Sequence, residues 1–199
     1  MIIRTYEPED DPALMALERL CPRGLPEPFV HCRRRFSDRA ALFAHYAVLV
    51  VEHEGAIIGT GALCVKDTQV GGVPVRLGYV FDIRTDPALR RRGIGQAIVD
   101  ACDEYLIACG AHGAYAHIVA SNVASLRLFE KRGYARQRQL MLLTYQPYPA
   151  TDIPAWMPRH SEDAFDGCER IVREHGERDL YVSDVAQAVR DFGFQRWTL

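Results

Sequence analysis

Long hydrophobic runs, an excess of one charge and paired cysteines are all missing from this sequence. No apolar run is long enough to cross a bilayer, and charged residues interrupt the N-terminal apolar residues, so we expect neither a membrane span nor a signal peptide. The formal net charge is -2 over 199 residues, which gives no general attraction to nucleic acid or to an anionic membrane. We therefore expect a cytoplasmic protein with no nucleic-acid or membrane partner.

The six cysteines and seven histidines do not have the spacing of disulfide or metal motifs. The cysteines are Cys21, Cys32, Cys64, Cys102, Cys109 and Cys168, and none forms a CxxC pair. Several occupy apolar positions, as buried free thiols do in a reducing compartment. The histidines are dispersed along the chain, so we expect no bound metal.

What is present is an ordinary globular composition, 48% hydrophobic and 25% charged, with a pattern of strands and helices. In chain order, we expect strands over residues 1–6, 46–51, 56–65, 73–85, 114–120 and 134–145. Three antiparallel strands in a row predict a meander with a turn over residues 67–72, and one β-α-β crossover follows. Helices are expected after residues 11, 28, 93 and 121. This order predicts the α/β class, with a mixed, mostly antiparallel central sheet flanked by helices.

The C-terminal part differs in composition from the rest. Four prolines between Pro147 and Pro158 mark a linker, and two amphipathic helices with a short strand follow it. We therefore divide the chain into a domain of residues 1–146 and a linker plus small helical α/β extension of residues 147–199. The extension is too small for a good core of its own, so we expect it to pack on the domain or on the second subunit of a homodimer.

The most informative stretch is Arg90-Arg91-Arg92-Gly93-Ile94-Gly95-Gln96, between a strand and a long helical pattern. Its two glycines allow a tight turn and leave no side chains in the way of a ligand. The amides of the turn and of the helix's first turn point into the positive end of the helix dipole, which predicts a diphosphate site. A P-loop would need a following Gly-Lys-Ser/Thr, and a dinucleotide fold would need a third glycine and a parallel sheet.

Two runs of three arginines accompany these elements. Arg91 and Arg92 either bind the phosphates or are solvated, and the local anion site favours at least one phosphate contact. Arg33 to Arg35 fall in the second helical stretch, over about residues 29–44. We interpret that second run as a solvated helix face, with the lining of an acceptor site as the alternative.

The glycine turn resembles the coenzyme A site of the GNAT (Gcn5-related N-acetyltransferase) superfamily. The family turn is Arg/Gln-x-x-Gly-x-Gly/Ala, and Arg90, Gly93 and Gly95 fill it. A second match lies downstream, where Asn122 to Tyr134 resembles the family's Asn, small residue, Leu-Tyr/Phe-Glu-Lys-x-Gly-Phe/Tyr pattern. The resemblance covers about residues 1–146 and implies a GNAT fold with acetyl-CoA as cosubstrate.

The resemblance also implies which residues meet the coenzyme. The amides of the glycine turn would hold the pyrophosphate, and the end of the third meander strand would pair through its backbone with the pantetheine. A splay between that strand and the strand at Ala114 would admit the pantetheine arm. The implied coenzyme-binding residues are Ile83, Arg84, Thr85, Arg90, Arg91, Arg92, Gly93, Ile94, Gly95, Gln96, Asn122, Ser125 and Phe129.

We predict an N-acetyltransferase in which a primary amine of an unidentified acceptor attacks acetyl-CoA directly in a ternary complex. A base must take a proton from the amine, and Asp82 is the best candidate because it interrupts an apolar run. The alternative for Asp82 is an ion pair with Arg84, and Tyr79 and Glu52 are weaker candidates for the base.

One departure from the family keeps other functions open. Many relatives have an acidic tyrosine where this chain has Phe129, which has no proton to give to the leaving thiolate. This favours a runner-up hypothesis, a catalytically weak acyl-CoA-binding sensor or assembly module. Nucleotide binding at the glycine turn is a third hypothesis. Tyr134 is expected to be a core residue rather than the acid.

Overall fold

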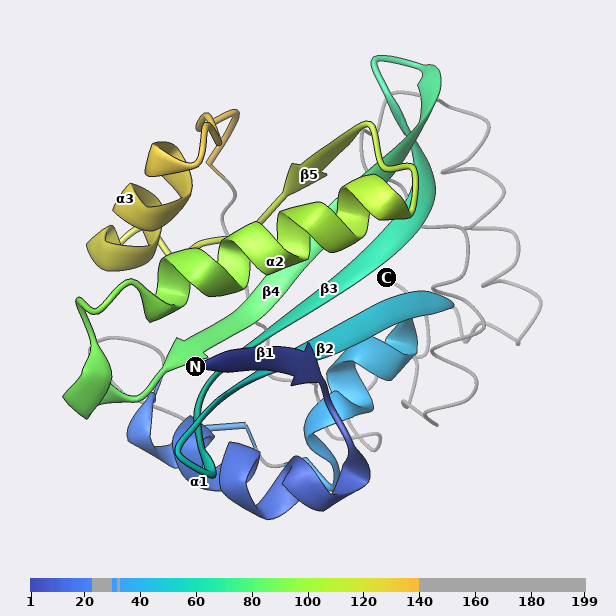
Figure 1. The fold of residues 1–199 in the computed structure, drawn as a ribbon. Helices are drawn as coiled ribbons and strands as arrows, with labels where there is room; N and C mark the ends of the chain where they lie inside the picture. Colours follow the sequence, from blue (N-terminus) through green and yellow to red (C-terminus); the bar gives the residue numbers. More distant parts are fainter. Residues whose placement is uncertain (23–29, 32, 140–199) are drawn as a thin grey trace, which may run out of the picture.

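The computed structural model describes residues 1–22, 30–31 and 33–139, which form one five-stranded sheet with helices on both faces (Figure 1). The strands lie in chain order: β1 (Ile2–Thr5), β2 (His45–His53), β3 (Ala56–Val70), β4 (Val73–Thr85) and β5 (Gly113–Tyr115). The first four pair antiparallel, and β5 joins β4 in parallel. The predicted mixed, mostly antiparallel α/β sheet is therefore confirmed. The proposed linker and extension, residues 147–199, lie outside the described residues.

Tight turns of two residues connect the meander. Glu54 and Gly55 turn between β2 and β3 with φ of 52° and 77°, and Gly71 and Gly72 turn between β3 and β4 with φ of 56° and 79°. Positive φ at both central residues gives a turn whose twist matches that of the strands. The predicted turn over residues 67–72 is too long, because β3 continues to Val70.

The helices cover the sheet from two sides. The 3-10 helix η1 (Pro8–Asp10) leads into α1 (Asp11–Leu20), which shares one face with the 3-10 helix η2 (Phe36–Leu42). The opposite face carries α2 (Ile94–Ala108), which follows the 3-10 helix η3 (Pro87–Leu89) (Figure 1). Asn122 precedes α3 (Val123–Lys131) and caps it by accepting a hydrogen bond from the Ser125 amide at 3.1 Å.

Three sequence predictions need correction. Of the helix expected over residues 29–44, the described residues form only η2, because the Asp38 carboxylate accepts hydrogen bonds from the amides of Arg34 and Arg35 and so caps a helix that begins at Phe36. The strand expected over residues 114–120 ends at Tyr115, because its ladder with β4 ends at the pair Tyr79–Tyr115. Residues 134–139 are not a strand, and residues 140–145 lie outside the described part.

Two glycines bring α2 close to the sheet. A Cβ atom at Gly78 would lie 2.3 Å from Leu106 Cδ1, and one at Gly61 would lie 2.5 Å from Ile98 Cγ2. Such contacts are too short for any side chain, so only glycine permits this approach. The core on this face therefore joins α2 directly to β3 and β4.

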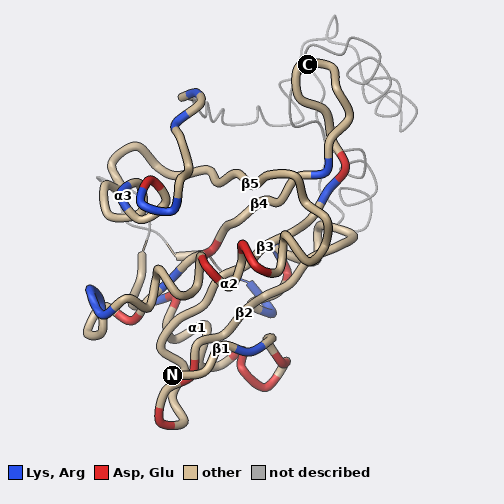
Figure 2. Tube along the Cα trace, turned by 45° about the horizontal axis from the view of Figure 1, so that its top comes forward, with Lys and Arg blue, Asp and Glu red and all other residues tan. Residues whose placement is uncertain are grey.

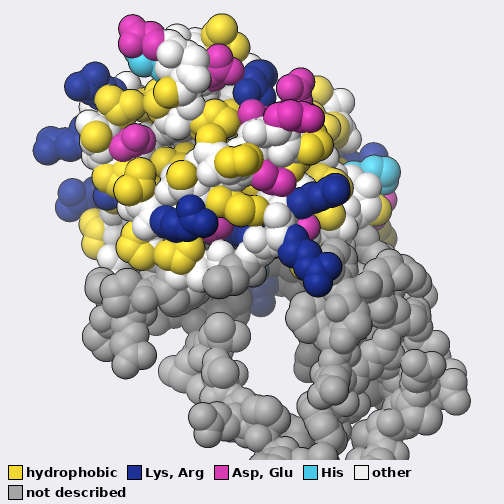
Figure 3. Space-filling model, turned by 90° about the horizontal axis from the view of Figure 1, so that it is seen from below, with side chains coloured by type: hydrophobic (Ala, Val, Ile, Leu, Met, Phe, Trp, Pro, Cys, Tyr) yellow, Lys and Arg dark blue, Asp and Glu magenta, His cyan; other side chains and the backbone are white. Residues whose placement is uncertain are grey.

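The surface agrees with the small net charge. Seen from below, the described part of the molecule presents hydrophobic, basic and acidic side chains intermixed (Figure 3). No helix among the described residues is long and apolar enough to cross a membrane.

Candidate active site

The glycine turn lies in the connection between β4 and α2. Beyond Thr85, η3 leads to an exposed loop in which Arg91 has a φ of 65° and Gly93 a φ of 82°. The first hydrogen bond of α2 runs from the Ala97 amide to the Gly93 carbonyl at 3.0 Å, so the amides before Ala97 precede the helix's own ladder. Figure 2 shows the basic residues of this loop along the backbone at the N-terminal end of α2. The loop thus combines outward amides, a positive helix end and three exposed arginines.

Gly95 fixes the first turn of α2 against its neighbours. A Cβ atom there would lie 3.3 Å from Leu128 Cδ2 in α3 and 3.8 Å from Thr85 Oγ1 at the end of β4. Cys21, just beyond α1, lies nearby, with its Sγ 3.5 Å from the Thr85 carbonyl and 3.8 Å from Arg90 Nη2. The structure therefore brings the predicted pantetheine strand and pyrophosphate loop together, and it adds Cys21, which sequence reasoning missed.

The expected splay between two strands is present. The parallel ladder of β4 and β5 consists of the pairs Leu77–Gly113, Gly78–Ala114 and Tyr79–Tyr115. Beyond Tyr79, β4 continues for six more residues to Thr85, while the described ladder with β5 has ended. The backbone of Ile83 to Thr85 therefore lies past the point where the two strands diverge, as the resemblance implied.

A bulge interrupts the pairing with β3 in the part of β4 that lies beyond the ladder with β5. Thr60 of β3 faces Arg84 and Ala62 faces Phe81, so Asp82 and Ile83 together oppose the single residue Gly61. Asp82 has a φ of 52°, which is unfavourable for a residue with a side chain. Such a conformation costs about 1–3 kcal/mol and persists only where surrounding contacts hold it.

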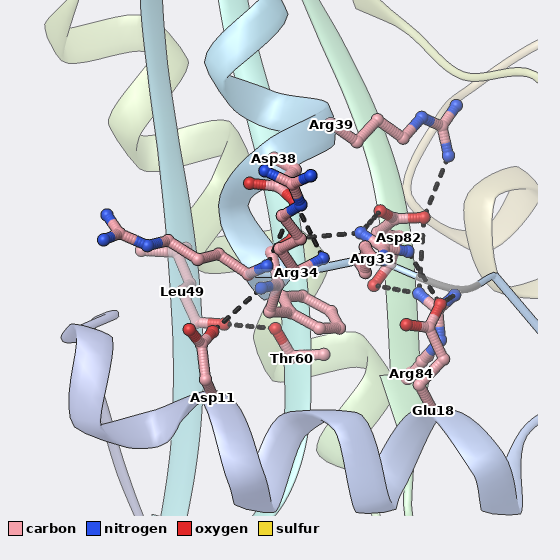
Figure 4. A network of polar contacts seen from close by, with 12 residues as sticks. Asp11, Glu18, Arg33, Arg34, Asp38, Arg39, Leu49, Thr60, Asp82 and Arg84 are labelled. Carbon is pink, nitrogen blue, oxygen red and sulfur yellow. Dashed lines mark hydrogen bonds and ion pairs between the residues drawn. The ribbon is translucent and has the colours of Figure 1, made fainter.

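Those contacts come from a buried group of charges, the Asp82 cluster, made of Glu18, Arg33, Arg39, Asp82 and Arg84 (Figure 4). The Asp82 carboxylate, 1% exposed, lies 3.0 Å from Arg33 Nη1, 2.9 Å from Arg39 Nη1 and 3.3 Å from Arg84 Nη1. Arg33 Nη2 donates a hydrogen bond to the Glu18 carboxylate at 2.7 Å, and Arg84 also pairs with Glu18. The ion pair of Asp82 with Arg84, the alternative to a catalytic base, is therefore present within a larger network.

The interpretation of Arg33 as part of a solvated helix face is wrong. Its side chain is 7% exposed and bridges Glu18 to Asp82, so it is neither solvated nor on a helix. One signal in the sequence pointed to this role, since Glu18 falls on the same helical stripe as Leu14 and Leu17 and is buried with them. A carboxylate on an apolar stripe requires a cationic partner, although the sequence does not say which one.

An aromatic row crosses the sheet beside the Asp82 cluster. The ring of Tyr79 stacks on Phe81 at 4.8 Å and on Tyr115 at 4.9 Å. His117 lies at the end of the row, 5.4 Å from the rings of both Tyr79 and Tyr115. Arg39 links the row to the cluster, because its Nη2 donates to the Tyr79 hydroxyl at 3.0 Å. Sequence reasoning missed His117, because a single histidine beyond a short strand carries no motif.

The remaining predicted residues lie around α3. Phe129 is 5% exposed and packs in the core under α2, with its ring edge-on to Tyr134 at 4.9 Å. The Tyr134 hydroxyl donates to Asp103 at 2.6 Å. Burial, and then this hydrogen bond, raise the pKa of Tyr134, which agrees with its interpretation as a core residue. Glu52, a weaker candidate for the base, pairs instead with Arg4 at 3.1 Å.

The described cysteines are free thiols. Cys64 and Cys102 are buried, as expected, whereas Cys21 is half-buried and Cys109 exposed. Burial raises the pKa of the Cys102 thiol to about 12, so this thiol is inert. Cys32 and Cys168 lie outside the described residues. Within residues 1–22, 30–31 and 33–139, no group of three or more histidine, cysteine and acidic side chains could hold a metal ion.

Comparison with solved structures shows the same architecture in acetyltransferases. An acetyltransferase from Trypanosoma brucei matches with 22% identity and a TM-score of 0.57, over 72% of this chain and 99% of that one. Glucosamine-6-phosphate N-acetyltransferase from Arabidopsis thaliana matches with 19% identity and a TM-score of 0.55, over 73% and 98%. AAC(6')-Iy, solved with the bisubstrate analog CoA-S-monomethyl-acetylneamine, matches with 17% identity and a TM-score of 0.57, over 73% and 98%. At these identities the likeness establishes the fold.

Comparison of sequences leads further. The acetyl transferase GW6a from Oryza sativa subsp. japonica is 33% identical over 125 residues, which make up 60% of this chain and 29% of that protein. This chain therefore spans less than a third of that curated relative. The model of the acetyltransferase (GNAT) family matches residues 12–134, which include the glycine loop, the splayed strands and α3. The chain belongs to the acetyltransferase (GNAT) family.

Proposed function

We propose that this protein transfers the acetyl group of acetyl-CoA to a primary amine, by direct attack within a ternary complex. The observation that carries the proposal is the glycine loop at the N-terminus of α2, next to the end of β4 beyond its divergence from β5. A diphosphate at this loop and an extended arm along β4 fit one ligand, coenzyme A. A nucleotide alone would not use the edge of β4 beyond the end of its ladder with β5.

We expect the coenzyme to make the contacts that the family resemblance implies. The amides of Gly93 to Gln96 would bind the pyrophosphate, and the charges of Arg90 to Arg92 would attract it. The backbone of Ile83 to Thr85 would pair with the pantetheine amides, as a strand pairs with its neighbour. Asn122 and Ser125, at the start of α3, and the buried Phe129 would line the coenzyme from the other side.

The chemistry needs few groups from the protein. The amine nitrogen attacks the thioester carbon, and a backbone amide of β4 would stabilise the oxyanion. The C–S bond then breaks and leaves the coenzyme A thiolate. Phe129 has no proton to give, so water would protonate this thiolate. Asp82 stays a predicted base from the sequence, but its burial and its three arginine partners favour a role in holding the β4 bulge.

A second candidate is an acyl-CoA-binding module with little turnover. Two observations favour it: Phe129 stands where many relatives have an acidic tyrosine, and Asp82 is enclosed by guanidinium groups. Both candidates require the same coenzyme site. Only the enzyme requires that coenzyme A be released when an amine is present.

Replacing Gly93 with leucine tests the coenzyme site. Gly93→Leu should weaken acetyl-CoA binding at least about tenfold, measured by calorimetry, because the side chain would stand among the phosphate-binding amides. Gly72→Leu is a matched control, since Gly72 has a φ of 79° against 82° for Gly93 and both have open space around the Cβ position. Equal affinity in Gly93→Leu and wild type would contradict the placement.

Turnover separates the two candidates. Steady release of coenzyme A from acetyl-CoA with a panel of primary amines supports the enzyme. Tight acetyl-CoA binding without release on the whole panel supports the binding module. ATP affinity without acetyl-CoA affinity would sink both.

A further inference from the structure

His117 lies just beyond the point where β4 and β5 diverge. The last pair of the ladder is Tyr79–Tyr115, and His117 follows two residues later, with its ring 5.4 Å from each of these two tyrosines. Tyr79 precedes the bulge residue Asp82 by three positions on β4. The imidazole therefore stands at the opening between the strands, on the sheet face that carries α1 rather than α2.

This position can be reached from outside. His117 is exposed, while Tyr79 beside it is buried. The adjoining Tyr115 is half-buried, and Lys66 Nζ covers its ring at 4.9 Å from the centroid. A ligand approaching the strand opening from this face would meet the imidazole before it meets any buried carboxylate.

The surroundings keep the imidazole neutral. Partial burial, and then the positive charges of Lys66 on β3, Arg39 on η2 and Arg138 beyond α3, lower the pKa of His117 below its usual 6.5. Within the described part of the chain, the rings of Tyr79 and Tyr115 also lie against the imidazole, and phenols ordinarily carry no charge near neutral pH. At pH 7 the ring therefore has one nitrogen with a free electron pair that can accept a proton.

Asp82, by contrast, is poorly placed for this task. Its carboxylate is 1% exposed, and its oxygens already face Arg33, Arg39 and Arg84. Protonation would remove the negative charge that pairs with the buried Arg33 and Arg84 and with the half-buried Arg39. Asp82 and His117 thus differ in the property that proton transfer requires, which is access to the substrate.

We propose that His117 is the general base of the acetyl transfer, an inference that rests on the function proposed above. As the amine nitrogen forms its bond to the thioester carbon, an N–H proton passes to the neutral imidazole nitrogen. The C–S bond breaks, and its electron pair goes to the sulfur of coenzyme A. The imidazolium then gives its proton to the thiolate or to water, and the positive charges of Lys66 and Arg39 favour this release.

The test uses the full chain with acetyl-CoA and the most active primary amine of a panel. His117→Gln should lower kcat about 100-fold or more, with an unchanged KM for acetyl-CoA. In the wild type, kcat/KM should fall as pH drops through a value below 6.5, because the protonated ring accepts no proton. This acid limb should be absent from His117→Gln. His53→Gln, an exposed histidine at the end of β2, is the matched control and should behave like the wild type.

A second variant separates chemistry from folding. His117→Ala should regain activity when free imidazole is added, which a merely structural histidine would not allow. If His117→Gln has the same rate and pH profile as an active wild type, the role of His117 is overturned and the proposed function still stands. Absence of turnover in the wild type on the whole panel overturns both, and the two failures are therefore distinguishable.

Discussion

The sheet has an apolar layer under α2 and a partly charged layer under α1. Under α2, the fully buried side chains include Ile98, Val99 and Leu106. Under α1, the charged residues Glu18, Asp82 and Arg84 are also buried, and the guanidinium groups of Arg33 and Arg84 lie 4.7 Å and 5.7 Å from the centre of the Phe36 ring. The same strands therefore support two interiors of different chemistry.

The two layers differ in how strongly their interactions depend on direction. Hydrophobic contacts depend on area and shape, so the α2 layer stabilises the fold without dictating one backbone angle. Ion pairs and hydrogen bonds require particular atoms in particular places. The Asp82 cluster can therefore hold Asp82 at a φ of 52°, where packing alone would let the strand straighten. The charged layer sets the course of β4 next to the opening where we expect the thioester.

Removal of Glu18 should have the largest effect on stability. Glu18→Ala leaves Arg33 and Arg84 with one carboxylate fewer in a buried site, and breaking a buried pair from one side costs about 3–5 kcal/mol. Urea denaturation measures this free energy of unfolding. The control Glu130→Ala removes an exposed pair with Arg136 and should cost well under about 1 kcal/mol. Equal losses in the two variants would show that the Asp82 cluster has no special weight.

Truncation of Ile98 probes the apolar layer. Ile98→Ala removes a fully buried side chain beside Gly61, and we expect a loss of about 3 kcal/mol in the free energy of unfolding. The affinity for acetyl-CoA should stay near that of the wild type, because Ile98 is not part of the Asp82 cluster that holds the β4 bulge. Calorimetry on both Ile98→Ala and Glu18→Ala makes the comparison direct. A weaker affinity in Ile98→Ala than in Glu18→Ala would reverse the roles that we assign to the layers.

The smallest of the predicted effects on stability is the loss of the ion pair between Arg4 and Asp10 in acid, at the edge of the charged layer. Arg4 lies 2.8 Å from each Asp10 oxygen, and these hydrogen bonds lower the pKa of Asp10 from its usual 3.8. The unfolded chain therefore binds this proton more readily than the folded chain. The stabilisation is complete above pH 3.8 and is lost as pH falls through the lower folded value.

The variant Asp10→Asn tests this titration. Its unfolding free energy should decline less steeply below about pH 4 than that of the wild type, as followed by urea denaturation across pH. Asp38→Asn is a control, because the Asp38 carboxylate hydrogen-bonds the amides of Arg34 and Arg35 rather than a guanidinium group. Parallel acid limbs for Asp10→Asn and wild type would remove Asp10 from the explanation.

Much of the fold follows from local signals. The predicted bounds of β4 match the structure, the glycine turn opens α2, and Asn122 caps α3. Each of these depends on residues within a few positions of one another: alternating apolar residues, a glycine at positive φ, and an amide side chain near free N–H groups. The glycine turn and the Asn122 match also sufficed to identify the family.

The errors come from contacts between distant segments. Arg33 has a helical context in the sequence, but its partners Glu18 and Asp82 lie 15 and 49 positions away. The length of β5 depends on how far it stays beside β4, and the ladder of the two strands ends at Tyr79 and Tyr115. His117 gains its importance from the same divergence.

The sequence by itself determined the family, the glycine loop and the order of the five described strands, because periodicity, glycines and caps act over short spans of chain. Only the tertiary structure decided which arginines meet Asp82, where β5 leaves the sheet and which histidine stands at the opening. Those outcomes depend on the packing of α1, η2 and β4 against one another, and ion pairs across such distances leave no pattern in a single sequence. The fold thereby transfers our assignment of the base from Asp82 to His117.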